Sequence, residues 1–598
     1  MAQVVKAFRS LSRAVVLQPV VPMEDDCDEE LELEDVELIM DAFQRADLNS
    51  DGTLSRDELW NALQSSMGLA EDEFDELFDG CDKNGDGTVN YHEFFDWIFA
   101  AREANNDIVE KVLQAPEDQA LHDNGITLEP ESDEHIKELS IIFPGYHEIE
   151  ETARRGITLP QLMKVIKYAK TRCRRWKDTS EYSKTHGESL TMDMLNLYHL
   201  NTWLIMPSTK RNKCAFVELL AIEAQTPTWF ISHWWGEVHL DFVRCVEKHV
   251  EIRDIPSNTA FWVCAYANRQ HDLQNEVVTD PKQSSFYKAI QMSRGILLVL
   301  DDKQKFSGPA TPFTRIWCAF EESVAIDQDD DLELILDIAT CRDSVPYLLT
   351  QGLTSREKKL EKTRYPGAGA KDKLLREKAF PIEVIEKGLT LELEKAEASV
   401  ESDKTHILNA IIGNKDLAKH PPKTHPIYNK VNHQLRSIFA KAAWPQAVEK
   451  HEVARLKLPA ILASDKDRKI LSLSFACSQH MGGPQLALLG KGLSPQLRHL
   501  ILDFSQCLQI GDAGITSLAI HFPKTLIHLR ISLIKCWQIS DIGICGLASH
   551  LPSTLEELRL DFEQCDQIQE IGLNLANKSL KILKLSFDHC KNLNDRGL

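Results

Sequence analysis

Basic residues are scarce in this 598-residue chain. It carries 68 lysines and arginines against 91 aspartates and glutamates, which gives a formal net charge of −23. Because binding to nucleic acid or to an anionic membrane requires a basic surface, this balance argues against both functions. Residues 24–41 contain no lysine or arginine at all. This stretch is either a solvated acidic segment or a region that raises the local cation concentration.

Several cysteine and hydrophobic patterns are also missing. The 14 cysteines include no Cys-x-x-Cys pair and no cysteine–histidine cluster with zinc-finger spacing. No apolar run approaches the roughly 18–20 residues that a membrane-spanning helix needs. A large chain of this kind without a signal peptide is expected to be cytoplasmic, with reduced thiols.

Two twelve-residue segments place oxygen-bearing residues at regular positions. Residues 47–58 read DLNSDGTLSRDE and residues 82–93 read DKNGDGTVNYHE. Positions 1, 3, 5, 7, 9 and 12 can together supply seven oxygens to a hard cation, and a glycine stands at position 6, where the chain must turn sharply. The predicted calcium ligands are Asp47, Asn49, Asp51, Thr53, Ser55, Glu58, Asp82, Asn84, Asp86, Thr88, Asn90 and Glu93.

These two loops and the apolar helical faces around them resemble the EF-hand family of calcium sensors and buffers. The resemblance implies an all-α, calmodulin-like lobe over residues 31–105 that binds two Ca²⁺ ions. Leu54 and Val89 occupy position 8 of their loops, where paired EF-hand loops join through a short β contact. The loops begin 35 residues apart, as expected for one two-loop lobe.

The first 22 residues leave the localisation open. Lys6, Arg9 and Arg13 are the only charged side chains before Glu24. Apolar residues recur at helical spacing on another face, at Val4, Phe8, Leu11 and Val15. Such a segment is a mitochondrial presequence, a basic amphipathic helix that a calcium sensor can bind, or a frayed terminus.

Residues 196–345 alternate short apolar runs with helical stretches. The runs are 228–232 (TWFIS), 259–266 (TAFWVCAY), 295–301 (GILLVLD) and 332–337 (LELILD). This alternation favours βαβ units and a parallel sheet. The flanking residues 106–195 and 346–460 are charged and are expected to be helical. A metal site built from His233, His239, His271 and Cys264 fits no known spacing, so these residues are expected to serve in packing and hydrogen bonding.

The same region resembles the Toll/interleukin-receptor (TIR) domain, which has a flavodoxin-like α/β fold. Three segments carry the resemblance: TWFISHWWGE (228–237), FYKAIQMSRGILLVLDD (286–302) and RIWCAFEESVA (315–325). In enzymatic members, the glutamate four residues after the tryptophan cleaves NAD, and here that residue is Glu321. The sequence departs from the family at NRQHDL (268–273), where an Arg-Asp-x-x-Pro-Gly loop is usual. That loop belongs to the substrate pocket and the self-association surface of the family, so the resemblance is weaker at both of these features.

Two interpretations of Glu321 stay open. A carboxylate held against a ribose can stabilise the oxocarbenium charge that develops when the ribosyl–nicotinamide bond breaks. Alternatively, Glu321 and its neighbour Glu322 are surface residues of a helix. The sequence therefore leaves open whether the chain is an enzyme, with NAD as a further ligand only in the first case.

An internal repeat occupies residues 461–598. Segments beginning at residues 497, 526 and 555 follow each other at intervals of 29 residues, and a fourth begins at residue 580. The pattern L-x-x-L-x-L-x-F-x-x-C-x-x-I resembles cysteine-containing leucine-rich repeats, which form an α/β solenoid. Its cysteines, Cys507, Cys536, Cys565 and Cys590, are expected to be buried and structural. The sequence stops at Leu598 in mid-repeat, so the last repeat is expected to be truncated or to pair with something.

Together these patterns predict a multidomain chain. It has an amphipathic and acidic segment (1–30), the EF-hand pair (31–105), a helical linker (106–195), the TIR-like domain (196–345), a helical region (346–460) and the repeats (461–598). The predicted function is calcium-responsive signalling or adaptor activity, with protein partners bound by the repeats and possible self-association through the TIR-like domain. A calcium-regulated NAD hydrolase is the alternative.

Overall fold

The computed structural model covers the whole chain, and it forms two compact units, residues 1–126 and 127–598. The residues described are 53–56, 58, 60, 74, 78, 87–90, 129–180, 183–273, 279–302, 308–326, 334–363, 368–570 and 579–593. The expectations for residues 1–30 therefore lie outside the described residues. In the first unit, β1 (Thr53–Ser55) pairs antiparallel with β2 (Thr88–Asn90).

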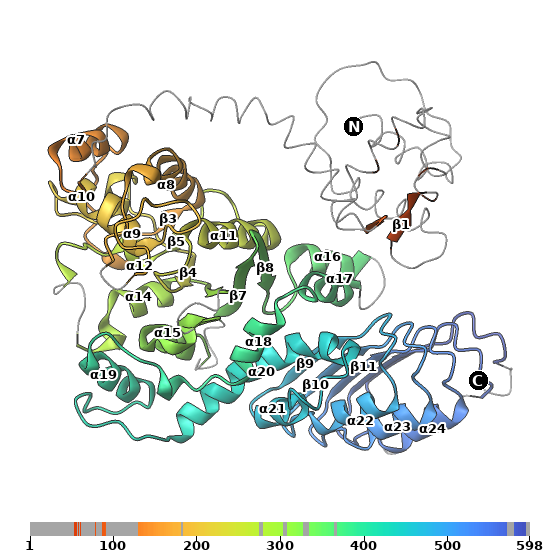
Figure 1. Cartoon of the computed structure of the whole chain (residues 1–598). Helices are drawn as coiled ribbons and strands as arrows, with labels where there is room; N and C mark the ends of the chain where they lie inside the picture. The colour runs from red at the N-terminus through yellow and green to blue at the C-terminus, as the bar shows by residue number, and fades with distance from the viewer. Residues whose placement is uncertain are drawn as a thin grey trace. The chain divides into compact units, whose positions relative to one another are not determined.

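A six-stranded mixed sheet lies at the start of the second unit (Figure 1). Its order is β3 (Ile157–Thr158), β5 (Ala260–Trp262), β4 (Trp229–Ser232), β6 (Gly295–Asp301), β7 (Ile335–Arg342) and β8 (Val345–Leu349). The four central strands are parallel, as the apolar runs predict, and the two edge strands are antiparallel. All seven residues of β6 are buried, as expected for a strand covered on both faces.

Helices cover both faces of this sheet. One face packs against α8 (Leu159–Arg172) and α11 (His239–Arg253), in a core that includes Leu297 and Val299. The other packs against α14 (Ser285–Met292) and α15 (Ile316–Ile326), in a core that includes Ile296 and Leu298. Alternate residues of β6 thus face opposite cores, following the two-residue period of a strand.

The expected helical linker contributes to this sheet as well. Residues 129–195 contain α7 (Asp133–Ile142) and α8, but they also supply the edge strand β3. Shorter helices α9 (Leu197–Leu200), α10 (Met206–Thr209) and α12 (Cys264–Ala267) follow, with a π-helical turn at Asn201–Ile205. The described part of this region is therefore only partly helical, because residues 143–151, 176–180 and 183–195 form loops and turns. Its one strand is too short to have been visible as an apolar run.

Residues 355–464 are mainly helical. The expectation of a helical region over 346–460 is wrong at its start, because residues 346–349 belong to strand β8. The helices are α16 (Ser355–Thr363), α17 (Ala368–Glu377), α18 (Ile382–Leu389), α19 (Glu401–Ile411), α20 (Pro426–Glu449) and α21 (Leu458–Ser464). The hydrophobic core of α20 is continuous with that of the mixed sheet and with that of the strands that follow.

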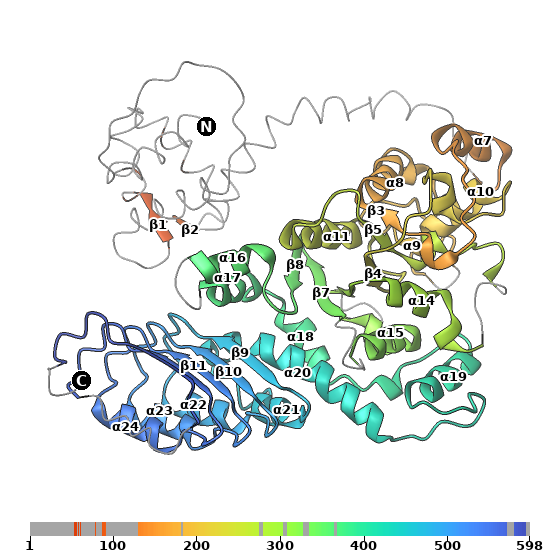
Figure 2. The same ribbon diagram turned by 180° about the vertical axis from the view of Figure 1, so that it is seen from behind.

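A second sheet of five parallel strands ends the described chain (Figure 2). Its strands are β9 (Ile470–Ser474), β10 (His499–Asp503), β11 (His528–Ser532), β12 (Glu557–Asp561) and β13 (Ile582–Ser586). Helices α22 (Gly483–Lys491), α23 (Asp512–Ala519) and α24 (Asp541–Ser549) connect the first four. Leu471, Leu500, Leu529, Leu558 and Leu583 stand in register across the sheet.

A row of thiols runs beside this sheet. Cys507, Cys536 and Cys565 are fully buried, and each Sγ donates to a backbone carbonyl 32 residues earlier in the chain. The sulfur–oxygen distance is 3.2 Å from Cys536 to Phe504 and 3.1 Å from Cys565 to Leu533. These three thiols are therefore packing residues that satisfy buried carbonyl groups, as expected. Cys590, which was expected to be buried with them, is only partly buried, and its Sγ donates to the Phe562 carbonyl at 3.1 Å.

Candidate functional site

The first candidate site is formed by the two paired loops of the first unit. Leu54 stands opposite Val89 in the β1–β2 ladder, and both side chains are fully buried. Phe74 and Phe78 are buried in the same unit, with their ring centroids 6.2 Å apart. The short β contact expected between position 8 of each loop is thus present, and it fixes the two loops side by side.

Two further loop positions have the conformation that a calcium loop requires. Gly87, at position 6 of the second loop, has a φ of +82°, a backbone conformation that favours glycine. In the first loop, Glu58 at position 12 is buried, and one of its carboxylate oxygens accepts hydrogen bonds from the Ser55 N–H (2.9 Å) and from the Ser55 hydroxyl (2.7 Å). The Glu58 N–H returns to the Ser55 hydroxyl at 3.4 Å, which completes a capping box at the helix start.

These features fit a calcium ion. A carboxylate at position 12 and a hydroxyl at position 9 are hard oxygen donors, and the capping box orients Glu58 at the end of the loop. The backbone of Thr53, Thr88 and Asn90 lies in the paired strands. The remaining predicted ligands (Asp47, Asn49, Asp51, Asp82, Asn84, Asp86 and Glu93) lie outside the described residues.

The second candidate site lies where β4 ends, in the second unit. In the sheet, β4 lies between β5 and β6. The two strands that follow β4 in the chain therefore lie on opposite sides of it. Ligands of open α/β sheets bind at the carboxyl ends of the strands beside such a switch point. Ser232 and His233 stand there, both buried, and the Cys318 thiol of α15 approaches the His233 carbonyl at 3.7 Å.

Glu321 of α15 faces this position from inside the protein. Its side chain is only 5% exposed, and that of Glu322 is fully buried. Burial raises the pKa of Glu321 to about 8, against weaker opposing effects of the Ser232 hydroxyl and of Arg315. Burial and the Glu321 charge raise the pKa of Glu322 well above its usual range. The interpretation of the two glutamates as surface residues is therefore wrong, because α15 packs both of them between the sheet and other helices.

The surroundings of Glu321 are closed. The Ser232 hydroxyl approaches the carboxyl without forming a well-aligned hydrogen bond, and the Trp235 indole N–H donates to the Cys264 sulfur at 3.1 Å. Trp317 packs against Phe286 with ring centroids 5.1 Å apart. A small cleft beside Trp317 is lined by Asp403 and His406, but Glu321 does not line it. Access to Glu321 from solvent would therefore require side chains to move.

The histidines considered for a metal site make other polar contacts. The His239 ring accepts or donates a hydrogen bond with the Tyr266 hydroxyl at 3.0 Å, and His271 contacts the Met206 carbonyl at 3.1 Å. Within the described ranges, no cluster of three or more histidine, cysteine or acidic side chains has the geometry of a metal site. Nor does any helix in those ranges have the length and apolar character needed to cross a membrane.

Sequence reasoning missed a third feature, a cleft between the mixed sheet, α20 and β9. Its lining comes from residues more than 170 positions apart, from Ala325 to Arg498. No local motif marks it, although the spacing of Lys430, Gln434 and Lys441 along one face of α20 is a signal that the sequence does contain.

Comparison with known proteins assigns the first unit. Residues 36–99 match the family description of an EF-hand domain pair. The chain is also similar to two Arabidopsis thaliana proteins, probable calcium-binding protein CML28 and probable calcium-binding protein CML29. Their identities are 32% and 33% over 66 residues, and each match covers 11% of this chain and 80% of the relative.

Proposed function

Because this chain belongs to the EF-hand family of calcium-binding proteins through its N-terminal region, we propose that it is a calcium-responsive signalling or adaptor protein. The observation that carries the proposal is the β1–β2 pairing of two complete loop sequences. Each loop has three carboxylates at ligand positions, which supports affinities in the sensor range, on the order of 10⁻⁷–10⁻⁵ M. On this proposal, the first unit detects calcium and the second unit carries the response.

Calorimetry of the full chain tests the calcium site. We expect two ions per chain, and the double variant Glu58→Gln, Glu93→Gln should bind neither, since each loop loses its bidentate ligand. Glu570→Gln is the matched control, because it makes the same chemical change at an exposed residue of the five-stranded sheet region. Two ions bound by the double variant would disprove the ligand assignment.

For the five-stranded sheet, we propose a leucine-rich-repeat solenoid that recognises a protein partner. Support comes from the 29-residue register of β9 to β12 and from the row of buried thiols. The strand positions that face away from the core carry mixed charge, with Arg530 paired to Glu361 at 3.3 Å and Glu557 accepting from His528 at 3.1 Å. A surface of this kind suits a polar protein rather than lipid.

NAD cleavage by the mixed-sheet domain is the second candidate function. The parallel strand order β5-β4-β6-β7 and the position of Glu321 one turn after Trp317 favour it. At neutral pH, however, Glu321 is mostly protonated in this closed state. As a proposed catalytic residue, it would need a bound cationic nicotinamide–ribose to favour its carboxylate form.

Incubation of the full chain with NAD, with and without calcium, tests this second function. Release of nicotinamide that depends on Glu321 and increases as the pH rises toward 8 would support it. Glu322→Gln serves as the comparison, since Glu322 lies about 100° further around α15. If no nicotinamide is released in either calcium state, even at concentrations where the chain self-associates through the TIR-like domain, the adaptor function alone remains.

A further inference from the structure

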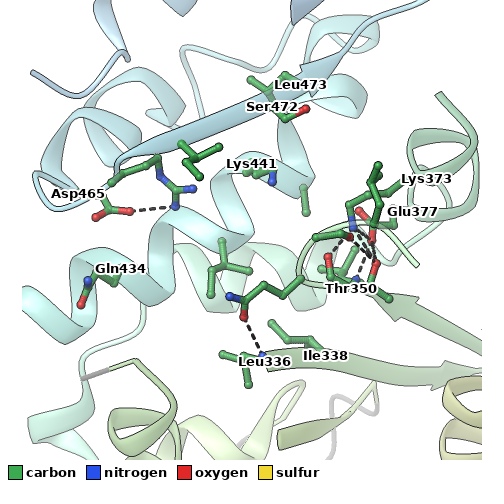
Figure 3. A pocket seen from close by; sticks show the side chains of 18 of the residues that line it. Leu336, Ile338, Thr350, Lys373, Glu377, Gln434, Lys441, Asp465, Ser472 and Leu473 are labelled. Atoms are coloured by element: carbon green, nitrogen blue, oxygen red, sulfur yellow. Dashed lines mark hydrogen bonds and ion pairs between the residues drawn. The ribbon is translucent and has the colours of Figure 1, made fainter. Parts of the chain in front are cut away.

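A cleft of about 980 Å³ lies between the mixed sheet, the helical region and the first strand of the five-stranded sheet (Figure 3). Its lining includes Leu336 and Ile338 of β7, one face of α17, one face of α20, and the segment from Asp465 into β9. Figure 3 shows Leu336 and Ile338 below the cleft, Ser472 and Leu473 above it, and Lys441 of α20 between them. This volume is in the range of small-molecule sites.

The charge of this cleft is opposite to that of the chain. Eight lysines and arginines line it, against three aspartates and glutamates, whereas the whole chain has a net charge of −23. A local excess of positive charge inside an acidic protein concentrates anions at one position rather than over a broad surface. The cleft therefore favours a compact anion over an extended polyanion such as nucleic acid.

Some of the acidic side chains in the cleft are already paired. Lys373 donates to the Glu377 carboxylate and to the Thr350 hydroxyl, the second at 2.8 Å. Arg468 forms an ion pair with Asp465 at 2.9 Å. The acidic residues thus position two of the basic side chains at opposite sides of the cleft, as in Figure 3, where Lys373 and Asp465 lie apart.

Three polar groups in the lining remain without partners. Among the described residues, none forms a hydrogen bond or ion pair with the Lys441 ammonium group. The Gln434 amide oxygen and the Arg468 Nε are buried without a hydrogen-bond partner. Burial, together with the charges of Lys373 and Arg468, lowers the pKa of Lys441 to about 8. The Lys441 ammonium group and the Arg468 Nε are donors, and an anion with several acceptor oxygens would supply the hydrogen bonds that they lack. The Gln434 oxygen is an acceptor and does not contribute to anion binding.

The floor of the cleft is apolar. Leu336, Ile338 and Leu349 from the sheet and Ile438 from α20 line it. A ligand that uses both parts of the cleft must combine an apolar or aromatic body with a group carrying several negative oxygens. Inorganic phosphate supplies only the second part, and an uncharged nucleoside supplies only the first.

We propose that this cleft binds an organic polyphosphate of the nucleotide type, with its phosphates at Lys441 and Arg468 and its apolar body on the Leu336–Ile438 floor. No part of the proposal depends on calcium binding or on NAD cleavage. Because the lining joins the mixed sheet, α20 and β9, a ligand held there bridges three parts of the second unit and should stabilise them against unfolding.

Calorimetry and thermal melting of the full chain in EDTA test the proposal, with ATP, tripolyphosphate and adenosine as probes. EDTA keeps divalent ions from linking ATP to the EF-hand pair. We expect ATP to bind and to raise the melting temperature, tripolyphosphate to bind more weakly and adenosine not to bind. Equal affinity for ATP and tripolyphosphate would show that the apolar floor plays no part and would overturn the proposal of an organic ligand.

Variants of Lys441 identify the site. Lys441→Met should weaken ATP binding by about tenfold or more, the usual loss for one charge-assisted hydrogen bond, while Lys441→Arg should largely retain binding. Lys423→Met, at an exposed lysine outside the cleft, should bind ATP like the wild type. Since Met removes a partly buried charge, Lys441→Met should melt no lower than the wild type without ligand. A stable Lys441→Met that binds ATP normally would overturn the assignment.

Proton linkage gives an independent readout. A phosphate beside Lys441 raises its pKa, so binding near pH 8 should take up a fraction of a proton from the buffer. Calorimetry in two buffers with different ionisation enthalpies measures this uptake. The uptake should disappear in Lys441→Arg, because an arginine stays protonated at this pH. Uptake that persists in Lys441→Arg would assign the proton to another group and would contradict the placement of the phosphates.

Discussion

Glu321 and Glu322 are neutral groups enclosed by the α/β core at neutral pH. A carboxyl whose pKa rises on folding binds a proton in the folded state that the unfolded chain releases. For Glu321, this happens between about pH 4.5 and about pH 8. Its contribution to the free energy of unfolding is therefore fully present below pH 4.5, and it is lost as the pH rises through about 8.

The Glu321→Gln variant should remove part of this pH dependence. Gln is close in shape and stays neutral at every pH, so its stability relative to the wild type should increase steadily as the pH rises. We expect this increase to be on the order of 1–3 kcal/mol between pH 6 and pH 8.5. Melting temperatures measured across this interval, above the isoelectric point of about 5.4, test the prediction. A loss of stability at both pH values would instead indicate that the carboxyl forms a specific bond in the core.

At the scale of elements, the row of thiols beside the five-stranded sheet should be chemically inert. Burial raises the pKa of Cys565 to about 12, and each thiol donates to a carbonyl inside the core. Cys545 of α24 is exposed. We expect iodoacetamide at pH 8 to modify Cys545 at least ten times faster than Cys536, because thiolate and access are both needed. Peptide mass spectrometry over a time course measures both rates, and equal rates would mean that these strands open readily.

The elements also show how far the sequence could predict the fold. The runs at 228–232 and 295–301 have enough consecutive apolar residues to mark β4 and β6, and a repeated leucine spacing predicts the register of β9 to β12. By contrast, β3 is two residues long, and its pairing depends on contacts made 100 residues later. Periodicity over a local window contains no signal for such a strand.

The candidate sites also differ in how far the sequence could predict them. Ligand positions in a calcium loop are local in sequence, so a segment of twelve residues is enough to predict them. Whether Glu321 is buried depends instead on the packing of α15 against β4 and α19, which a sequence of alternating apolar runs does not specify. The same reason applies to the cleft at Lys441, whose charges meet only after three separate regions have folded together.

For the whole molecule, the prediction concerns apolar surface in the calcium-binding region. If residues 33–100 act as a sensor, calcium should open an apolar groove between their helices. The fluorescence of a hydrophobic dye should then rise on calcium addition. Deletion of residues 1–20 should increase it further, if the basic N-terminal segment is the internal occupant of the groove. If the deletion leaves the fluorescence unchanged, the result would favour the interpretation of residues 1–20 as a targeting peptide or an unattached tail.

The β1–β2 ladder has a consequence for how the chain responds to graded calcium. Three residue pairs join the two loops, and the central pair, Leu54 and Val89, is buried. An ion that orders one loop therefore also restrains the backbone of the other, and by linkage each ion raises the affinity for the second by the same factor. Calcium occupancy should then rise more steeply with concentration than it would for two independent sites, with a Hill coefficient between 1 and about 2.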